Sequence, residues 1–553
     1  MKGTQTKLGS FSSASQSEEP QLVPESYTGM YAMHKYWSKK PFNLVRNLIL
    51  KYSNKDDIVM DPFCGSGISI IESILTHRIA VGVDINPAAI FITKEMLMKI
   101  PPKEIEKEFN KIQNDCEEQI NDLYAVKRDE EKLVGTHFIW KKNDLTEVWY
   151  LDRNGKKLVS KPHLTDVELA QSFSYGDTPF YYPQAKLFHN ARINAKSNMH
   201  VYDLFTPRNI HALSIILNRI EKIKNQEMKN LFKFCFTAAL GQASKMVFVI
   251  NKRGKFNGDK QQERKEVGSW VIGYWIPKEN FEINAWNCFA SRFNRILKAK
   301  KEQYILDYEI KPTEKFSELQ NNNLFLENDS SLHVLKKLPN NSIDYIITDP
   351  PHGNRLPYLE LSMMWNSWLG NTVNYDDEII VSEAKDRQKN LANYNILLGK
   401  VLTEIDRVLK PNKYFTLMFN SLDDDTWNDL LTMIKDLGLE LHDIGTMDYS
   451  ATSVVQDNRR RGLKTDFVLT FKKTKVKRNH EIKFLSGNEE KKQIKLLIDN
   501  FMMKNNNAET YQILNHIITN SLKENKFFRL ADVISVIEDE FASKIKTLKS
   551  EIV

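Results

Sequence analysis

The sequence predicts an α/β fold built on an open, mostly parallel sheet. Two stretches support this prediction, because in each a short apolar strand runs into an acidic residue and a tight turn. The first strand meets Asp61 in residues 59–67, and the second meets Asp349 in residues 343–353. Open α/β sheets bind ligands at the carboxyl ends of their strands. We therefore expect both acids to face a ligand site.

The first stretch opens a pattern typical of a β-α-β unit, residues 59–84. Gly65 in its turn precedes Asp84 by about the spacing that brings a carboxylate to the ribose hydroxyls of a nucleotide. A dinucleotide would require a further glycine near Ile70 and no anion at the turn, because pyrophosphate binds there. Ile70 is bulky and Asp61 is negative. The pattern therefore favours a cationic ligand, S-adenosylmethionine.

In the second stretch, residues 343–353, two prolines end the strand. Pro350 and Pro351 fix the backbone and remove two amide donors, so the strand cannot continue past Asp349. By itself this could be an ordinary turn, since Asp and Pro are common turn residues. The pairing with the glycine turn favours a functional interpretation.

The two motifs DPFCGSG and DPPH together resemble the amino-methyltransferases that methylate exocyclic amino groups of bases in DNA. The resemblance covers roughly residues 30–100 and 320–473. It implies a Rossmann-like class I methyltransferase sheet with a large inserted α+β region and a C-terminal helical extension. The family motif usually ends on Tyr, Phe or Trp, which stacks on the extruded base. Here that position is His352.

The resemblance also implies roles for individual residues. The implied catalytic residues are Asp349, Pro350, Pro351 and His352. The implied cofactor-binding residues are Lys40, Pro41, Asp61, Pro62, Phe63, Gly65, Gly67, Asp84, Ile85 and Asp329. In the family, the Lys-Pro motif helps hold the methionine end of the cofactor, and an acid at the position of Asp329 accepts a hydrogen bond from its adenine.

Composition and motif positions predict five parts of the chain. Residues 1–25, rich in Ser, Gln and Glu, are expected to be disordered. Residues 26–100 form the cofactor-binding half of the methyltransferase domain, and residues 101–320 form an inserted target-recognition region. Residues 321–475 form the catalytic half, and residues 476–553 form a helical accessory domain.

The inserted region carries several local signals. Asn154 and Gly155 between two strand patterns predict a hairpin with a type I′ turn. Thr206 and Pro207 predict a helix start. Residues 103–128 are expected to form solvated or paired helices, residues 186–196 an exposed loop, and the run containing Trp270, Tyr274 and Trp275 a strand. Basic loops provide the expected contacts with DNA phosphates: Lys252, Arg253, Lys255, Arg459, Arg460 and Arg461.

Composition limits the class of protein. The net charge of +7 permits a polyanionic partner such as nucleic acid. The four cysteines show no C-x-x-C spacing, so we expect no metal site and no disulfide framework, and a reducing cytoplasm is the simplest location. No run of 18 apolar residues and no basic-then-apolar leader occurs, so neither a membrane span nor a secretory signal is expected.

The resulting hypothesis is site-specific methylation of double-stranded DNA, in a restriction-modification or defence system with a possible partner subunit. An acid before Pro-Pro resembles the adenine-N6 enzymes, whereas the cytosine-N4 enzymes tend to carry Ser. Methylation of cytosine carbon-5 would require a Pro-Cys nucleophile, and no Pro-Cys pair occurs. Three alternatives remain: a cytosine-N4 enzyme, a guanosine-amino RNA methyltransferase, which Gly353 fits, and an inactive DNA-binding subunit, which His352 favours.

Overall fold

The computed structural model describes most of the chain, and the statements below concern these residues: 24–129, 131–253, 263–353, 356–420, 424–435, 437–448, 465–474, 483–485, 487–505, 510–524, 526–529 and 532–537. The predicted disorder of residues 1–25 falls almost entirely outside them.

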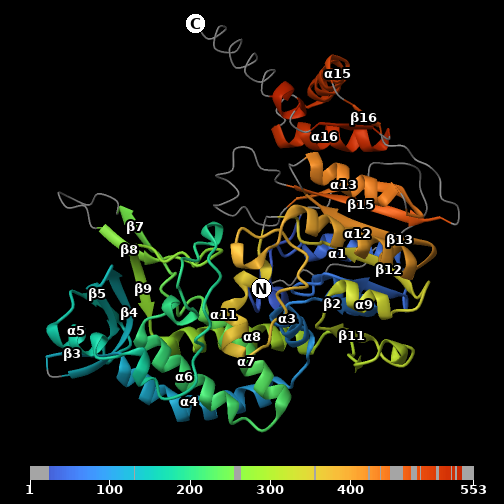
Figure 1. The fold of residues 1–553 in the computed structure, drawn as a ribbon. Coiled ribbons are helices and arrows are strands. Elements are labelled where there is room, and N and C mark those ends of the chain that lie inside the picture. The colour runs from blue at the N-terminus through green and yellow to red at the C-terminus, as the bar shows by residue number, and fades with distance from the viewer. Residues whose placement is uncertain are drawn as a thin grey trace, which may run out of the picture.

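The fold is organised around a central sheet whose eight described strands run in the order β10-β11-β2-β1-β12-β13-β15-β14 (Figure 1). Neighbouring strands are parallel from β10 to β13, and only β15 is antiparallel to both of its neighbours. The strands are β1 (Ile58–Asp61), β2 (Ile79–Val83), β10 (Pro312–Thr313), β11 (Leu324–Glu327), β12 (Ile343–Thr348), β13 (Leu409–Phe419), β14 (Leu439–Asp448) and β15 (Thr465–Lys473). The predicted α/β class with a parallel sheet is confirmed.

Helices cover both faces of this sheet because its central strands are apolar on both faces. Val59 and Tyr345 point into one core, shared with α1 (Phe42–Tyr52), α2 (Ile68–Leu75) and α3 (Pro87–Leu97). Met60 and Ile346 point into the opposite core, shared with α9 (Ser331–Lys337), α12 (Leu391–Val408) and α13 (Asp424–Lys435). This arrangement is consistent with a Rossmann-like fold.

Between α3 and β10 the chain leaves the central sheet to form the inserted region (Figure 1). Its helices include α4 (Pro102–Leu123), α5 (Leu164–Gln171), α6 (Pro207–Glu221), α7 (Gln226–Leu240) and α8 (Ala285–Tyr304). Its strands are β3 (Ala125–Arg128), β4 (Glu131–Lys141), β5 (Asp144–Leu151), β6 (Lys157–Ser160), β7 (Val249–Arg253), β8 (Glu263–Val267) and β9 (Glu279–Ile283). All the strands except β7 and β8 form one antiparallel sheet, and β7 and β8 pair with each other.

Two predicted elements of this region, the helix start at Thr206 and the hairpin around Asn154, are present. Thr206 caps α6, since its Oγ1 accepts a hydrogen bond from the Asn209 amide at 3.1 Å, and Pro207 is the first helical residue. The predicted hairpin forms from β5 and β6, but its type I′ turn is wrong. Gly155 has a φ of 75°, whereas Asn154 is not among the residues of positive φ that a type I′ turn requires. The Gly155 amide instead donates to the Asp152 carbonyl at 3.0 Å.

Three other predictions in the inserted region need correction. The run around Trp270 and Tyr274 contains no strand; Trp270 packs where a Cβ on Gly241 would lie, and the strand β9 comes later. Helix α4 is not merely solvated, because Phe109 and other residues on one of its faces are buried against α6 and α8. The basic loop near residue 190 is also partly buried, at Leu187 and Ile193.

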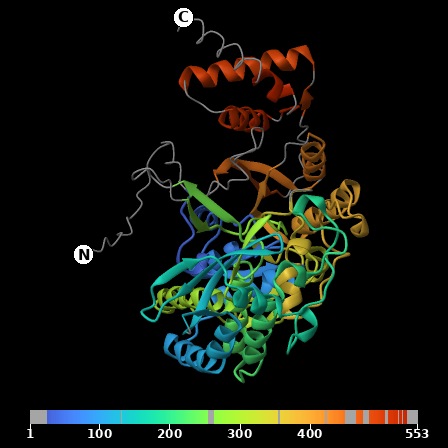
Figure 2. The same ribbon diagram turned by 90° about the vertical axis from the view of Figure 1, so that its left-hand side faces the viewer.

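The C-terminal elements lie against the β14 edge, on the other side of the sheet from the inserted region (Figure 2). They comprise α15 (Asn488–Lys504), α16 (Thr510–Lys523) and a parallel strand pair, β16 (Lys483–Leu485) with β17 (Lys526–Phe528). The predicted helical extension therefore also contains a short strand pair. None of the described helices is both long and apolar enough to span a membrane.

Candidate active site

The two acidic turns open at the same edge of the sheet. Strands β1 and β12 are parallel neighbours, with Val59 opposite Tyr345, so their carboxyl ends coincide. The Thr348 hydroxyl donates to Asp61 Oδ1 at 2.7 Å and links the end of one strand to the turn after the other. Residues from segments nearly 300 positions apart therefore form one site.

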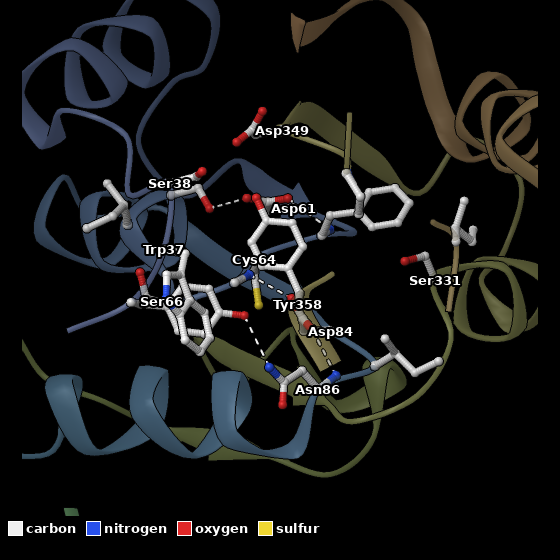
Figure 3. Close-up of a pocket in the computed structure, with 18 of the residues that line it drawn as sticks. Trp37, Ser38, Asp61, Cys64, Ser66, Asp84, Asn86, Ser331, Asp349 and Tyr358 are labelled. Atoms are coloured by element: carbon white, nitrogen blue, oxygen red, sulfur yellow. Dashed lines mark hydrogen bonds between the residues drawn. The ribbon is translucent and has the colours of Figure 1, made fainter. Parts of the chain in front are cut away.

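A pocket lies at this edge of the sheet (Figure 3). The predicted site residues that line it are Lys40, Asp61, Phe63, Gly65, Asp84, Ile85, Asp349 and Pro351. The structure does not place the remaining ones on its wall: Pro41, Pro62, Gly67, Asp329, Pro350 and His352.

The glycine turn requires residues without a side chain. Gly65 and Gly67 have φ values of 51° and 77°, in the left-handed region that favours glycine. A Cβ on Gly67 would lie 2.3 Å from Thr93 Cγ2, so α3 leaves no room for alanine there. Gly67 therefore shapes the turn from behind without lining the pocket.

Asp84 is held rigidly at the end of β2. Its Oδ2 accepts from the Gly65 amide at 2.8 Å and its Oδ1 from the Asn86 amide at 2.8 Å (Figure 3). Burial raises the pKa of this carboxyl from 3.8 to about 7. The group is therefore close to half ionised at neutral pH and can gain from a ligand that donates to it.

Asp61 accepts more hydrogen bonds from the protein than Asp84 does. Besides Thr348, it accepts from the Phe63 amide at 3.0 Å and from the Ser69 hydroxyl. Burial raises its pKa to about 6. The hydrogen bonds make Asp61 a structural link between the two turns as well as part of the pocket wall.

Asp349 is contacted by two side chains, those of Lys40 and His352. Lys40 Nζ lies 2.8 Å from its Oδ2, and the same ammonium lies 2.5 Å from Asp466 Oδ2 on β15. His352 Nε2 lies 2.9 Å from Asp349 Oδ1, yet neither atom makes a hydrogen bond within the described residues. The His352 ring packs edge-on against Phe419, 5.5 Å between centroids. His352 thus faces the carboxylate and the core of the sheet.

The backbone after Asp349 is fixed from α12 and from the segment that follows. The Tyr394 hydroxyl donates to the Pro351 carbonyl at 2.6 Å, and the Val381 amide donates to the Gly353 carbonyl at 3.2 Å. The proline turn therefore keeps its shape through two long-range hydrogen bonds.

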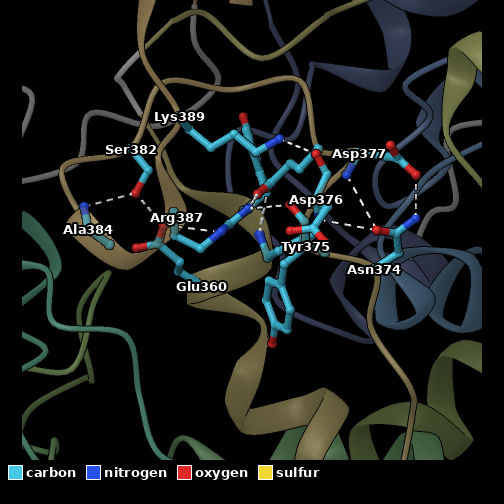
Figure 4. A network of polar contacts seen from close by, with 12 residues as sticks. Glu360, Asn374, Tyr375, Asp376, Asp377, Ser382, Ala384, Arg387 and Lys389 are labelled. Carbon is cyan, nitrogen blue, oxygen red and sulfur yellow. Dashed lines mark hydrogen bonds and ion pairs between the residues drawn. The ribbon is translucent and has the colours of Figure 1, made fainter. Parts of the chain in front are cut away.

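A buried ionic network holds the outer wall of the pocket (Figure 4). Arg387 lies 3.2 Å from Glu360 on α10 (Tyr358–Leu361) and 2.5 Å from Glu378. Glu360 also accepts from the Asn190 side chain of the inserted region at 2.7 Å, and Glu378 accepts from the Leu359 amide at 3.0 Å. This network positions residues 377–379, which line the pocket.

Asp329 has partners outside the pocket. Its carboxylate accepts from the Ser330 amide at 2.7 Å and contacts His333 and Lys337 at 3.2 and 3.4 Å. Its neighbours Ser330 and Ser331 line the pocket instead. The structure therefore brings this segment to the pocket but turns the acid toward its own helix.

The predicted DNA contacts are only partly within the described residues. Lys252 and Arg253 lie on β7, where the Lys252 ammonium pairs with Glu266 at 2.7 Å. Lys255, Arg459, Arg460 and Arg461 lie outside the described part of the chain.

Several aromatic residues of the pocket are outside the set of site residues assigned from the sequence, although a role for Trp37 was considered together with that of Lys40. Tyr36 and Tyr358 both line it, with ring centroids 6.3 Å apart, and Trp37 lines it with an indole Nε1 that is buried without a hydrogen bond partner in the described residues. The dense aromatic and basic run before Pro41 was the available signal. Its pattern could not show which side chains face inward.

Comparisons with known proteins agree with the motifs. Residues 10–95 match a family model described as DNA methylase, of the N6 and N4 type. Over 68 residues the chain is 32% identical to the type II methyltransferase M2.MboI of Moraxella bovis, in a match that covers 12% of this chain and 25% of the relative. In these segments the chain is therefore similar to DNA methylases of the N6 and N4 type. The chain spans about a quarter of the length of that curated relative.

Two solved structures share weaker similarity. One, provisionally described as a DNA modification methylase of Thermus thermophilus and complexed with S-adenosyl-L-methionine, is 14% identical with a TM-score of 0.16, covering 31% of this chain and 62% of that one. The other, a SAM-dependent methyltransferase of Methanosarcina mazei, is 14% identical with a TM-score of 0.14, covering 27% and 66%.

Proposed function

We propose that this protein transfers a methyl group from S-adenosylmethionine to the exocyclic amino group of a base flipped out of double-stranded DNA. The observation that carries the proposal is the hydrogen bond between Thr348 and Asp61, at 2.7 Å, which joins the two turns at one pocket. Asp349 therefore lies on the wall of the pocket that also contains the Gly65 turn.

The residues present fit the methyl donor. Asp84, beside the glycine turn, would accept hydrogen bonds from the ribose hydroxyls. Asp61, Asp377 and Glu378 on the pocket wall suit a ligand with a sulfonium and an ammonium. The buried Trp37 Nε1 provides a donor for its carboxylate.

The chemistry needs precise positioning more than acid-base catalysis. S-adenosylmethionine, when bound, supplies an electrophilic methyl group whose sulfur leaves as a neutral thioether. Asp349, on the pocket wall, accepts one amino hydrogen, and the carbonyl of Pro350, which does not line the pocket in this structure, is the acceptor we propose for the other. Together they localise the nitrogen lone pair and direct it at that methyl group. Orientation of this kind can supply several kcal/mol of barrier reduction. The nitrogen sheds a proton after transfer.

The target must leave the duplex, because the amino group is paired within it. Flipping costs a few kcal/mol, which phosphate contacts and the pocket offset. Lys252 and Arg253 on the β7–β8 hairpin are our proposed phosphate contacts among the described residues, with Lys255 and residues 459–461 beyond them. We favour adenine-N6 as the target, since an acid precedes Pro-Pro, and a restriction-modification or defence system as the setting.

The test is transfer of labelled methyl from S-adenosylmethionine to duplex DNA, single-stranded DNA and tRNA, followed by nucleoside analysis. We expect label in duplex DNA as N6-methyladenine. N4-methylcytosine would correct the base, and label in tRNA alone would refute the DNA substrate. Cofactor binding without label in any nucleic acid would indicate an inactive subunit.

A further inference from the structure

We propose that Lys40, anchored by Asp466, holds one oxygen of Asp349 and leaves the other as the acceptor for the target amino group. This inference rests on the proposed function and refines it. Lys40 then acts on the catalytic carboxylate instead of on the cofactor, and Asp466 becomes a positioning residue.

The contacts of Lys40 with the two carboxylates are short, and the three side chains are largely buried. Lys40 Nζ lies 2.8 Å from Asp349 Oδ2 and 2.5 Å from Asp466 Oδ2. The exposed fractions of the three side chains are 7%, 16% and 0%. Charge pairs in such surroundings are screened much less than surface pairs, so the ammonium holds both carboxylates firmly.

The two oxygens of Asp349 are not equivalent. Oδ2 is taken by Lys40, whereas Oδ1 is buried and accepts no hydrogen bond within the described residues. Both nitrogens of His352, which contacts Oδ1 at 2.9 Å, are also without hydrogen bonds there. Buried polar atoms normally have partners, so an unpaired acceptor beside the pocket indicates a partner that arrives with the substrate. We assign that place to the target amino group.

Asp466 explains why Lys40 adopts this position. Lys40 lines the pocket, and an ammonium bonded only to Asp349 could move further into it, where its charge would repel a sulfonium. Asp466, on the buried β15 next to β13, holds the ammonium beside Asp349. The pair therefore balances charge and fixes the rotation of the catalytic carboxylate.

The alternative role of Lys40, holding the methionine end of the cofactor, makes a different prediction. A cofactor ligand would change the affinity for S-adenosylmethionine. A positioning residue for Asp349 would change the transfer rate at saturating cofactor and leave that affinity nearly constant.

The experiment compares Lys40→Gln, Asp466→Asn and the double variant in the full chain. We expect Lys40→Gln to lower kcat about a hundredfold, with calorimetric affinity for S-adenosylmethionine within about twofold of wild type. Asp466→Asn should lower kcat about tenfold, and the double variant should transfer no more slowly than Lys40→Gln. Lys51→Gln is the matched control, because it breaks an exposed pair between α1 and β14, with Asp443 at 3.1 Å, and should leave kcat unchanged.

A weaker cofactor affinity with unchanged kcat in Lys40→Gln would overturn the inference in favour of the cofactor role. Full additivity of the two substitutions in kcat would also overturn it, because Asp466 would then act independently of Lys40. Thermal unfolding gives a measure that does not depend on activity: the two single losses in Tm should together exceed the loss in the double variant. A wild-type protein that methylates no DNA would refute the proposed function, while the unfolding cycle would still report on the ion pair.

Discussion

The two turns of the site differ in whether their polar side chains already have hydrogen-bond partners within the protein. The acids of the glycine turn have their oxygens occupied by the protein itself: Asp84 by two backbone amides, and Asp61 by an amide and two hydroxyls. The Asp349 turn instead keeps a buried oxygen and both nitrogens of His352 without hydrogen bonds in the described structure. One turn is therefore preformed for binding, and the other is incomplete until a substrate arrives.

This difference teaches how binding and reactivity can be separated within one pocket. A turn that satisfies its own polar groups keeps its geometry with or without ligand. A turn with unpaired polar groups gains most from the partner that completes it, so its interactions contribute chiefly to the reaction. Substitutions in each turn and in its supporting contacts test this division.

Asp349→Ala should lower the rate of methyl transfer about a thousandfold or more, because it removes the acceptor for the amino group. Affinity for S-adenosylmethionine should remain within a few-fold of wild type, as measured by calorimetry. Asp344→Asn is the control, since Asp344 lies at the other end of β12 and pairs with Lys410 at 2.8 Å. Equal loss of transfer and cofactor binding in Asp349→Ala would show that Asp349 serves the structure of both turns.

Arg387→Ala should destabilise the fold by about 3–5 kcal/mol, because it leaves Glu360 and Glu378 buried without their cation. Chemical denaturation measures this loss. Arg387→Met, which fills the space but removes the charge, should be nearly as unstable, which separates the charge from the packing. A loss below about 1 kcal/mol would mean that the outer wall is held by other contacts.

Cofactor affinity should fall about tenfold between pH 8 and pH 6, because Asp84 has a pKa of about 7 and its ionised carboxylate is the stronger acceptor for the ribose hydroxyls. The unliganded protein should show the opposite trend. A folded pKa above the ordinary 3.8 means that this group's contribution to stability rises as pH falls through 7. Asp84→Asn should flatten both profiles, and a profile unchanged by this substitution would assign the titration elsewhere.

Tyr394→Phe should have the smallest effect. It removes the hydrogen bond of 2.6 Å to the Pro351 carbonyl, worth about 1 kcal/mol, and should lower kcat several-fold without changing cofactor affinity. Steady-state kinetics at saturating cofactor measure this. A change in cofactor affinity alone would show that α12 supports the preformed glycine turn. That result would contradict the division of roles between the two turns.

Much of the local structure could be predicted from short patterns. The strand, glycine turn and helix around Gly65 follow from residues close in sequence, and so do the starts of α3 at Asn86 and of α6 at Thr206. Each is set by backbone preferences and capping within a few residues. The turn after Asn154 was mispredicted because a neighbouring side chain, that of Asp152, accepts hydrogen bonds from the Asn154 and Lys156 amides and selects a longer loop.

Short sequence patterns could not predict the contacts that organise the site. Lys40 and Asp466 are far apart in sequence, and nothing near either residue indicates the other. The same holds for Asn190 and Glu360, which join the inserted region to the pocket wall at 2.7 Å. These pairs arise only when separate segments pack together.

The sequence alone determined that two strands would end on acids, that one turn would need glycine, and that the other would be stiffened by proline. Those properties are local, since they depend on φ angles and on hydrogen bonding over a few residues. The tertiary structure alone decided that β12 would pair with β1, which oxygen of Asp349 would meet Lys40, and which would face His352. Such choices depend on burial and charge pairing between distant segments, which no local pattern contains.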